Sequence, residues 1–227
     1  RRFKARLSPR LGISHPVSDN QTLFFSYGHF SKWPKPQNVY QKISPANAQS
    51  TFQTFGNPNL NPETSVSYEL GLKTQFSSDD VLTITAYYRD IFDYITRKTA
   101  KISSPRFSSQ TYTTYINSDY SRSRGIELEY KKRIGKWFNG NASFTYAIVT
   151  GKSSSEDEGV LVSRGDIKES IKEKSMSWDR PFTASLSTSF YVEKDKPLFG
   201  FAPGILDDIN LYLRFFFQSG KRYTPAV

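Results

Sequence analysis

Apolar and polar residues alternate with a period of two along much of the chain. The clearest case runs from Glu63 to Phe76, where every second residue from Thr64 to Phe76 is apolar or weakly polar and the residues between are polar. On a strand such residues share one face, whereas on a helix they would spread around the whole surface. The same alternation recurs over residues 3–14, 22–28, 81–89, 125–130, 141–148, 182–190 and 209–218. The pattern therefore predicts eight two-faced strands and no amphipathic helix.

Short and long connections between these strands also alternate. Residues 16–21, 77–80 and 135–137 are short and rich in turn formers, while residues 31–62, about 93–113 and 150–179 are long and polar. Residues 193–207 depart from this rule, because they make a longer turn than the other short ones. Outer-membrane β-barrels have short turns at one end, longer loops at the other, and strands of ~9–11 residues. The chain is therefore predicted to be all-β, an antiparallel up-and-down transmembrane β-barrel.

Two other folds share the alternation. A soluble β-sandwich that binds carbohydrate would also bury one face of each strand. Eight strands could instead close on themselves into a small outer-membrane barrel with a structural or adhesive role. Charged residues on the polar parity favour a membrane barrel, since a water-filled lumen accepts them and a protein core accepts them only when paired.

The composition agrees with two-faced strands. A mean hydropathy of −0.57 stands beside 18 Phe and 14 Tyr, and averaging over an apolar and a polar face produces that combination. No Cys is present and only two His, so thiolate chemistry, disulfides and multi-His metal centres are excluded. The sequence therefore indicates no catalytic residues, no metal site and no cofactor.

Five segments, in order, resemble those of TonB-dependent outer-membrane receptors. They are Ser8–Gly12 (SPRLG), Gly56–Gly71 with its NPNLNPE and SYELG, Tyr87–Ile95 (YYRDIFDYI), Ser123–Leu128 (SRGIEL) and Ser219–Pro225 (SGKRYTP). The resemblance implies a location in the cell outer membrane and a 22-stranded barrel closed by an N-terminal plug. It also implies import of a scarce small-molecule nutrient (siderophore, cobalamin or oligosaccharide class) with energy from the TonB complex. No plug and no TonB box are visible, so residues 1–227 are interpreted as a fragment, about eight strands of the barrel domain.

The net charge of +10 is concentrated at one end. Arg1, Arg2, Lys4, Arg6 and Arg10 supply half of it within ten residues, which argues against a nucleic-acid partner. Lys4, Arg6 and Arg10 share the polar parity of one predicted strand, and Glu127 and Glu129 share that of another. These five residues are expected to face the lumen, where they would contact the plug or an anionic substrate.

Two arginines break the rule that charges lie on the polar parity. Arg122 and Arg124 share the parity of Ile126 and Leu128, which is expected to face lipid. They precede that strand on the side of a long loop, so they are expected at head-group level. Arginine's planar fork suits phosphate, and lipopolysaccharide phosphates are therefore the expected partner beside the outer-membrane lipid.

Ligand recognition is expected in the outer loops, because binding residues concentrate on loops held by a rigid scaffold. Four aromatic residues punctuate the first long loop, and they are the candidate substrate-binding residues: Trp33, Tyr40, Phe52 and Phe55. Aromatic rings on an exposed loop can stack on a ligand, but they can equally hold the loop together. The sequence leaves both roles open.

Overall fold

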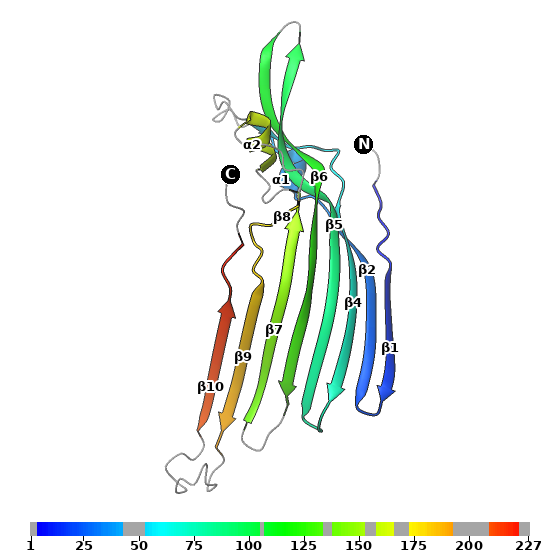
Figure 1. The fold of residues 1–227 in the computed structure, drawn as a ribbon. Coiled ribbons are helices and arrows are strands. Elements are labelled where there is room, and N and C mark those ends of the chain that lie inside the picture. The colour runs from blue at the N-terminus through cyan, green and yellow to red at the C-terminus, as the bar shows by residue number, and fades with distance from the viewer. Residues whose placement is uncertain are drawn as a thin grey trace.

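The computed structural model forms one sheet, whose main path is antiparallel and runs up and down in chain order (Figure 1). It describes residues 4–42, 53–104, 107–133, 138–152, 158–165, 173–192 and 209–222. The main path of the sheet is β1 (Arg10–Ser18), β2 (Gln21–Lys32), β4 (Glu63–Gln75), β5 (Asp80–Ser104), β6 (Phe107–Lys132), β7 (Phe138–Gly151), β9 (Phe182–Tyr191) and β10 (Asn210–Gln218). At the upper end, β3 (Gln53–Phe55) pairs with β6 and β8 (Lys174–Ser175) pairs with β7. A short helix precedes each of these strands in the chain, α1 (Pro36–Tyr40) before β3 and α2 (Glu158–Arg164) before β8.

The eight predicted strands are confirmed in their predicted order, and the sheet excludes two alternatives. The described residues form a single sheet rather than two facing ones, which contradicts the soluble sandwich. Within the same residues β1 and β10 are the two edges and do not pair, so the sheet is open and not a closed eight-stranded barrel. No helix in the described ranges is long and apolar enough to cross a membrane.

Two predicted boundaries are wrong. The first strand begins at Arg10 and continues through Pro16 to Ser18, because an edge strand tolerates proline's missing N–H; its register shifts between Pro16 and Ser18. The segment 93–113, expected as a loop, belongs almost entirely to β5 and β6, which form a tall hairpin above the rest of the sheet (Figure 1). The sequence of this part contains threonine and tyrosine, which favour strands, but polar residues occur at both parities and so the alternation is missing.

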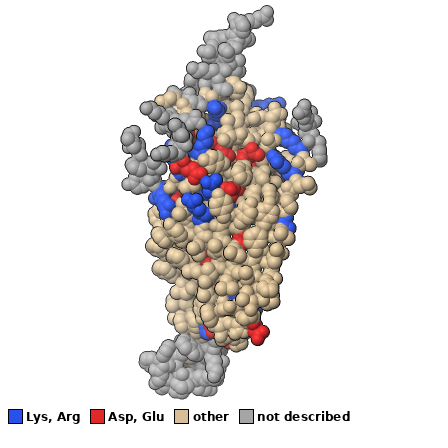
Figure 2. All heavy atoms as spheres, turned by 45° about the vertical axis from the view of Figure 1, so that its right-hand side comes forward, with Lys and Arg blue, Asp and Glu red and all other residues tan. Residues whose placement is uncertain are grey.

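The two faces of the sheet have opposite character. Directly paired residues share a face, so the register assigns every side chain of the ladder to one side or the other. One parity carries exposed apolar residues, such as Leu70 at 51%, Ile126 at 49% and Phe215 at 59% exposure, while on the other Ser67 is only 4% exposed. In Figure 2 the charged residues gather over the upper part of the molecule, above a largely uncharged zone. An exposed apolar band opposite a polar face is the arrangement of a wall between lipid and a lumen.

Two ion pairs mark the edges of this band. On the apolar parity Asp80 lies opposite Lys132 and Asp90 lies opposite Arg122, ten residues further along each strand. Between them this face carries Leu82, Ile84, Ala86, Tyr88, Arg124, Ile126, Leu128 and Tyr130. With a rise of ~3.4 Å per residue and a tilt of ~35–45°, ten residues span about 24–28 Å across the membrane. The apolar band of outer-membrane barrels is ~25 Å tall, so the spacing matches.

The lower pair lies at the turn between β4 and β5, below the apolar band. Hydrogen bonds from the Tyr130 hydroxyl, the Ser77 hydroxyl and the Lys132 ammonium lower the pKa of Asp80 to about 2. Tyr130 Oη is 2.6 Å from Asp80 Oδ1, and Lys132 Nζ is 2.9 Å from the same atom. Asp80 therefore remains ionised at neutral and mildly acidic pH, and the pair joins β5 to β6 at this edge.

Candidate functional site

The outer rim is organised by residues 57–63, the NPNLNPE segment that leads into β4. Asn57 Nδ2 donates to Tyr115 O at 2.8 Å, and Asn61 N donates to Asn117 Oδ1 at 2.8 Å. Asn117 Nδ2 returns a bond to Asn61 O at 3.0 Å, while the side chain of Pro62 is fully buried. The segment is thus tied to β6 by side-chain amides where no strand ladder exists.

Glu63 of this segment and Asn117 of β6 satisfy the backbone groups that two β-bulges leave without ladder partners. The register between β5 and β6 shifts between Ile91 and Tyr94 and again before Ile95, and Asp93 has a φ of 57°. Glu63 Oε1 accepts the Ile95 N–H at 3.2 Å, and Asn117 Nδ2 donates to Asp93 O at 2.8 Å. Buried amides need such partners, which explains an asparagine and a glutamate at these positions.

Removing the Asn117 amide is expected to loosen the rim without unfolding the sheet. Asn117→Ala deletes bonds to Asn61 and Asp93, and each hydrogen bond contributes about 1 kcal/mol. Hydrogen exchange of the Asn61 amide should therefore speed up by roughly one to two orders of magnitude, while amides in the middle of β5 stay protected. Equal exchange at Asn61 in both proteins would contradict this role.

The two flanking loops are fastened to the tall hairpin. β3 pairs in parallel with Tyr112–Thr114 of β6, and the Phe55 ring meets the Tyr112 ring edge-on at 5.8 Å between centroids. On the other side α2 packs against β5, where Gly159 approaches the Arg97 carbonyl so closely that a Cβ would lie 2.6 Å from that oxygen. The hairpin of β5 and β6 therefore holds the described part of each loop, β3 on one side and α2 on the other.

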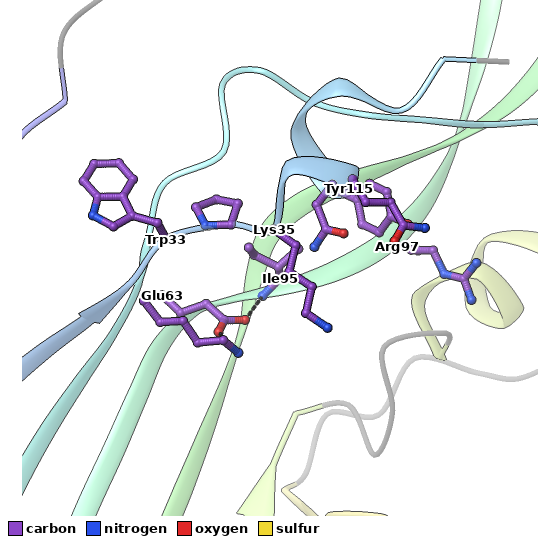
Figure 3. A pocket seen from close by; sticks show the side chains of 10 residues that line it. Trp33, Lys35, Glu63, Ile95, Arg97 and Tyr115 are labelled. Atoms are coloured by element: carbon purple, nitrogen blue, oxygen red, sulfur yellow. Dashed lines mark hydrogen bonds and ion pairs between the residues drawn. The ribbon is translucent and has the colours of Figure 1, made fainter.

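A polar cavity of about 280 Å³ opens between the first loop and the hairpin. Its lining includes Lys32, Trp33, Lys35, Glu63, Arg97 and Tyr115. Figure 3 shows Trp33 and Arg97 at opposite ends of the group, with Lys35 and Glu63 between them. Glu63 already binds Lys32 Nζ at 3.0 Å and the Ile95 amide at 3.2 Å. Because Glu63 is already engaged by Lys32, the ammonium of Lys35 adds a positive charge to this lining, which suits an anionic ligand.

The four aromatic residues expected to bind ligand have different environments. Trp33 lines the cavity and is 51% exposed, whereas Tyr40 is 59% exposed and does not line it. Phe55 packs on Tyr112 and so holds the loop together, and Phe52 lies outside the described residues. Lys32, Lys35 and Glu63 were not predicted as site residues, although the lysines of the KWPK stretch flank Trp33. Their grouping depends on register, which the sequence alone does not show.

The expected basic stripe already has partners within the chain. Lys4 Nζ donates to Asn59 O at 2.6 Å, Leu60 O at 2.8 Å and Asn61 Oδ1 at 3.2 Å. Arg6 lies 3.6 Å from Asp93, and the Arg10 guanidinium stacks 4.5 Å from the Phe30 ring centroid. Lys4 and Arg6 precede β1, which begins at Arg10, so the prediction that all three lie on one strand is wrong. Their contacts tie the segment before β1 to the rim. A contact of these residues with a plug or substrate stays a prediction.

The carboxylates and arginines of β6 lie on the parities expected for them. Glu127 is opposite Thr85 and Glu129 opposite Thr83 on the polar parity, where Glu129 pairs with Lys131 at 2.7 Å. Arg122 and Arg124 are on the apolar parity, because both bulges come beyond Ser121. Within the described ranges no three His, Asp or Glu side chains lie close enough to hold a metal ion. The plug and lipopolysaccharide contacts of these residues stay predictions.

Comparison with known proteins gives the family. The family model described as "TonB dependent receptor-like, beta-barrel" matches residues 1–227. The Iron-regulated outer membrane virulence protein of Vibrio cholerae is 31% identical over 103 residues, which are 44% of this chain and 16% of that protein.

Solved structures show the same fold. The alcaligin outer-membrane receptor FauA of Bordetella pertussis matches 96% of this chain and 30% of its own, with 20% identity and a TM-score of 0.54. The outer-membrane transporter YddB of Escherichia coli matches 81% of this chain and 26% of its own, with 15% identity and a TM-score of 0.57. This chain thus spans less than a third of these proteins. It belongs to the TonB-dependent receptor β-barrel family, and its strands form part of a barrel wall in the outer membrane.

Proposed function

We propose that the chain is part of the wall of a receptor that imports a scarce nutrient, with ferric siderophores as the preferred class. Energy for import comes from the TonB complex, which acts through parts of the protein outside this wall, including a plug in the lumen. The two-faced sheet carries the proposal, because an exposed apolar face and a charged polar face separate lipid from a watery path. The wall binds and guides its ligand, and it performs no bond chemistry.

Two observations support iron. Among the relatives, the Vibrio cholerae protein is named as iron-regulated, FauA as a receptor for alcaligin, and one structure as Pseudomonas aeruginosa FpvA with a pyoverdine–Fe complex. FpvA matches 94% of this chain, with 14% identity and a TM-score of 0.52. The second observation is the cationic cavity beside Trp33, which fits an anionic iron chelate better than a neutral oligosaccharide.

An uptake assay with the whole receptor tests the proposal. Cells that lack the gene should fail to take up radioactive iron from one ferric siderophore, and the restored gene should recover uptake only when TonB is active. Cobalamin or oligosaccharide uptake in place of iron would contradict the siderophore class. Normal uptake of every tested nutrient by cells lacking the gene would overturn import itself.

A matched pair of lysine variants tests the cavity. Lys35 lines it, whereas Lys42 is exposed on the same loop and does not. Lys35→Gln removes about 1 kcal/mol of attraction for an anion, so the dissociation constant of the siderophore should rise roughly fivefold. Lys42→Gln should leave it unchanged. Equal constants for the two variants and the unmodified receptor would place the ligand elsewhere.

A further inference from the structure

The outer edge of the apolar band is a row of tyrosines. In the register Tyr27, Tyr68 and Tyr88 lie opposite one another on β2, β4 and β5, and Arg124 is next in the same row on β6. All four have the apolar parity, and the Tyr27 and Tyr68 rings are 5.2 Å apart between centroids. Membrane barrels carry such aromatic girdles at the level of the lipid head groups. Arg124 is thus a cation within an aromatic girdle.

The row above contains a second arginine whose charge is already neutralised. Arg122 Nε lies 2.9 Å from Asp90 Oδ1, and Arg122 Nη1 lies 3.1 Å from Glu173 Oε1. The Thr150 hydroxyl donates to the other oxygen of Glu173 at 2.8 Å. The two carboxylates neutralise the guanidinium, so Arg122 joins β5, β6 and the segment before β8 and does not need an external anion.

Arg124 has no such compensation. It is exposed, and among the described residues neither an acidic side chain nor a hydrogen-bond acceptor is found for its guanidinium. An arginine facing the lipid boundary is costly unless an anion or water reaches it. Directly below it on the same face lie Ile126, at 49% exposure, and Leu70 on β4, at 51%. The site therefore offers one free cation directly above an apolar surface.

We propose that Arg124 binds a phosphate group of a phosphorylated glycolipid in the outer leaflet, with lipid A as its chemical class. The guanidinium can grip two phosphate oxygens at once, while the acyl chains of the same molecule pack against Leu70 and Ile126. A free phosphate ion has no chains and cannot use this apolar surface. The proposal holds for any imported nutrient, because the site lies on the lipid face rather than in the lumen.

The chain contains a matched control. Arg89 on β5 is next to Tyr88 but has the opposite parity, so it occupies the same depth on the lumen face. Its nearest acidic partner, Glu69, is 4.0 Å away. Arg124→Gln and Arg89→Gln therefore remove the same charge from opposite faces of the wall. Arg124→Lys keeps the charge but loses the planar fork.

The test measures lipid binding by the purified whole receptor in detergent. Bisphosphorylated lipid A is titrated against each protein, with fully dephosphorylated lipid A of the same chain composition as the second probe. Arg124→Gln should weaken binding of the phosphorylated lipid roughly tenfold, as expected for a lost charge-assisted contact, and Arg124→Lys by less. Arg89→Gln should leave the affinity for the phosphorylated lipid unchanged. Arg124→Gln should leave the affinity for the dephosphorylated lipid unchanged.

Three outcomes would overturn the proposal. They are equal affinity of the unmodified receptor for both lipids, an unchanged affinity in Arg124→Gln, and an equal loss in Arg89→Gln. A fourth outcome would also overturn it: inorganic phosphate that binds as tightly as the phosphorylated lipid would identify a free-anion site in which the acyl chains play no part. The comparison of the two lipids on the unmodified receptor needs no variant, so equal affinities would overturn the proposal even when Arg124→Gln fails to fold.

Discussion

Replacing Asp179 with alanine is expected to destabilise the outer rim by about 3 kcal/mol, a larger loss than any exposed substitution should cause. Asp179 is fully buried, with 0% of its surface exposed. Its Oδ1 accepts the Val149 N–H at 3.0 Å, and its Oδ2 lies 3.7 Å from Arg222 Nε without a hydrogen bond. The variant leaves both the amide and the guanidinium without their partner.

This carboxylate replaces a missing piece of strand. The ladder between β7 and β9 ends where Tyr146 pairs with Phe182, and Pro181 O then accepts the Ala147 N–H at 2.9 Å. The next amide of β7 that points toward the β9 side, at Val149, binds the Asp179 side chain instead of a backbone carbonyl. Arg222, in the segment after β10, reaches the same side chain, so one residue joins β7, β9 and β10.

A urea titration of the purified receptor, followed by tryptophan fluorescence, measures the loss. Asp179→Asn is the control, because it keeps an oxygen for the Val149 amide and removes only the charge. Arg222 is 38% exposed at its side chain, so the ion pair should be the smaller part of the effect. Equal losses in the alanine and asparagine variants would show that the charge, rather than the amide, accounts for the stability.

Replacing Gly125 with alanine is expected to cost about 3 kcal/mol and to reduce the amount of folded receptor in the membrane. A Cβ at this position would collide with the backbone oxygen of Tyr146, and it would also lie 2.9 Å from the Tyr87 hydroxyl. A backbone atom within a strand ladder cannot move aside as a side chain can. The neighbouring strands β6 and β7 would therefore have to separate locally.

Two other glycines on the same polar parity provide controls. Gly12 has nothing within 4 Å of its Cβ position, so Gly12→Ala should have no measurable effect. At Gly71 the collision is with the Phe24 ring, a side chain, so Phe24→Ala should restore folding to Gly71→Ala. Tyr87→Ala should not restore it to Gly125→Ala. Rescue there would mean that the tyrosine, rather than the Tyr146 backbone, causes the collision.

The sheet could be predicted from the sequence because its signal is local. A strand reverses its facing with every residue, so Glu63 to Phe76 reveals both the strand and its two faces within fourteen positions. Residues 93–113 could not be assigned in this way. In the sequence, polar residues occupy both parities of this stretch, and its described part is strand because β5 and β6 satisfy each other's backbone beyond the rim.

For the candidate site, too, the sequence shows some residues directly, and others are recognised only in the fold. Trp33 is an aromatic residue on a polar loop, which the sequence shows directly. Lys32 and Glu63 are thirty-one positions apart, and only the pairing of β2 with β4 brings them together. Likewise, parity separated Arg122 and Arg124 from the other charges, but only the fold shows that Glu173 neutralises Arg122 while Arg124 remains unpaired among the described residues.

The sequence by itself determined the strands, their two faces and the family, because period-two alternation and the NPNLNPE and SYELG segments are written in consecutive residues. Only the tertiary structure decided how the rim is held and which charges are free. Those outcomes depend on register, on two bulges and on contacts such as Asp179 with Val149, which join residues thirty positions apart. An aspartate or an arginine is the same residue at every position of a sequence. Its role depends on the distance to its nearest partner, which only the fold sets.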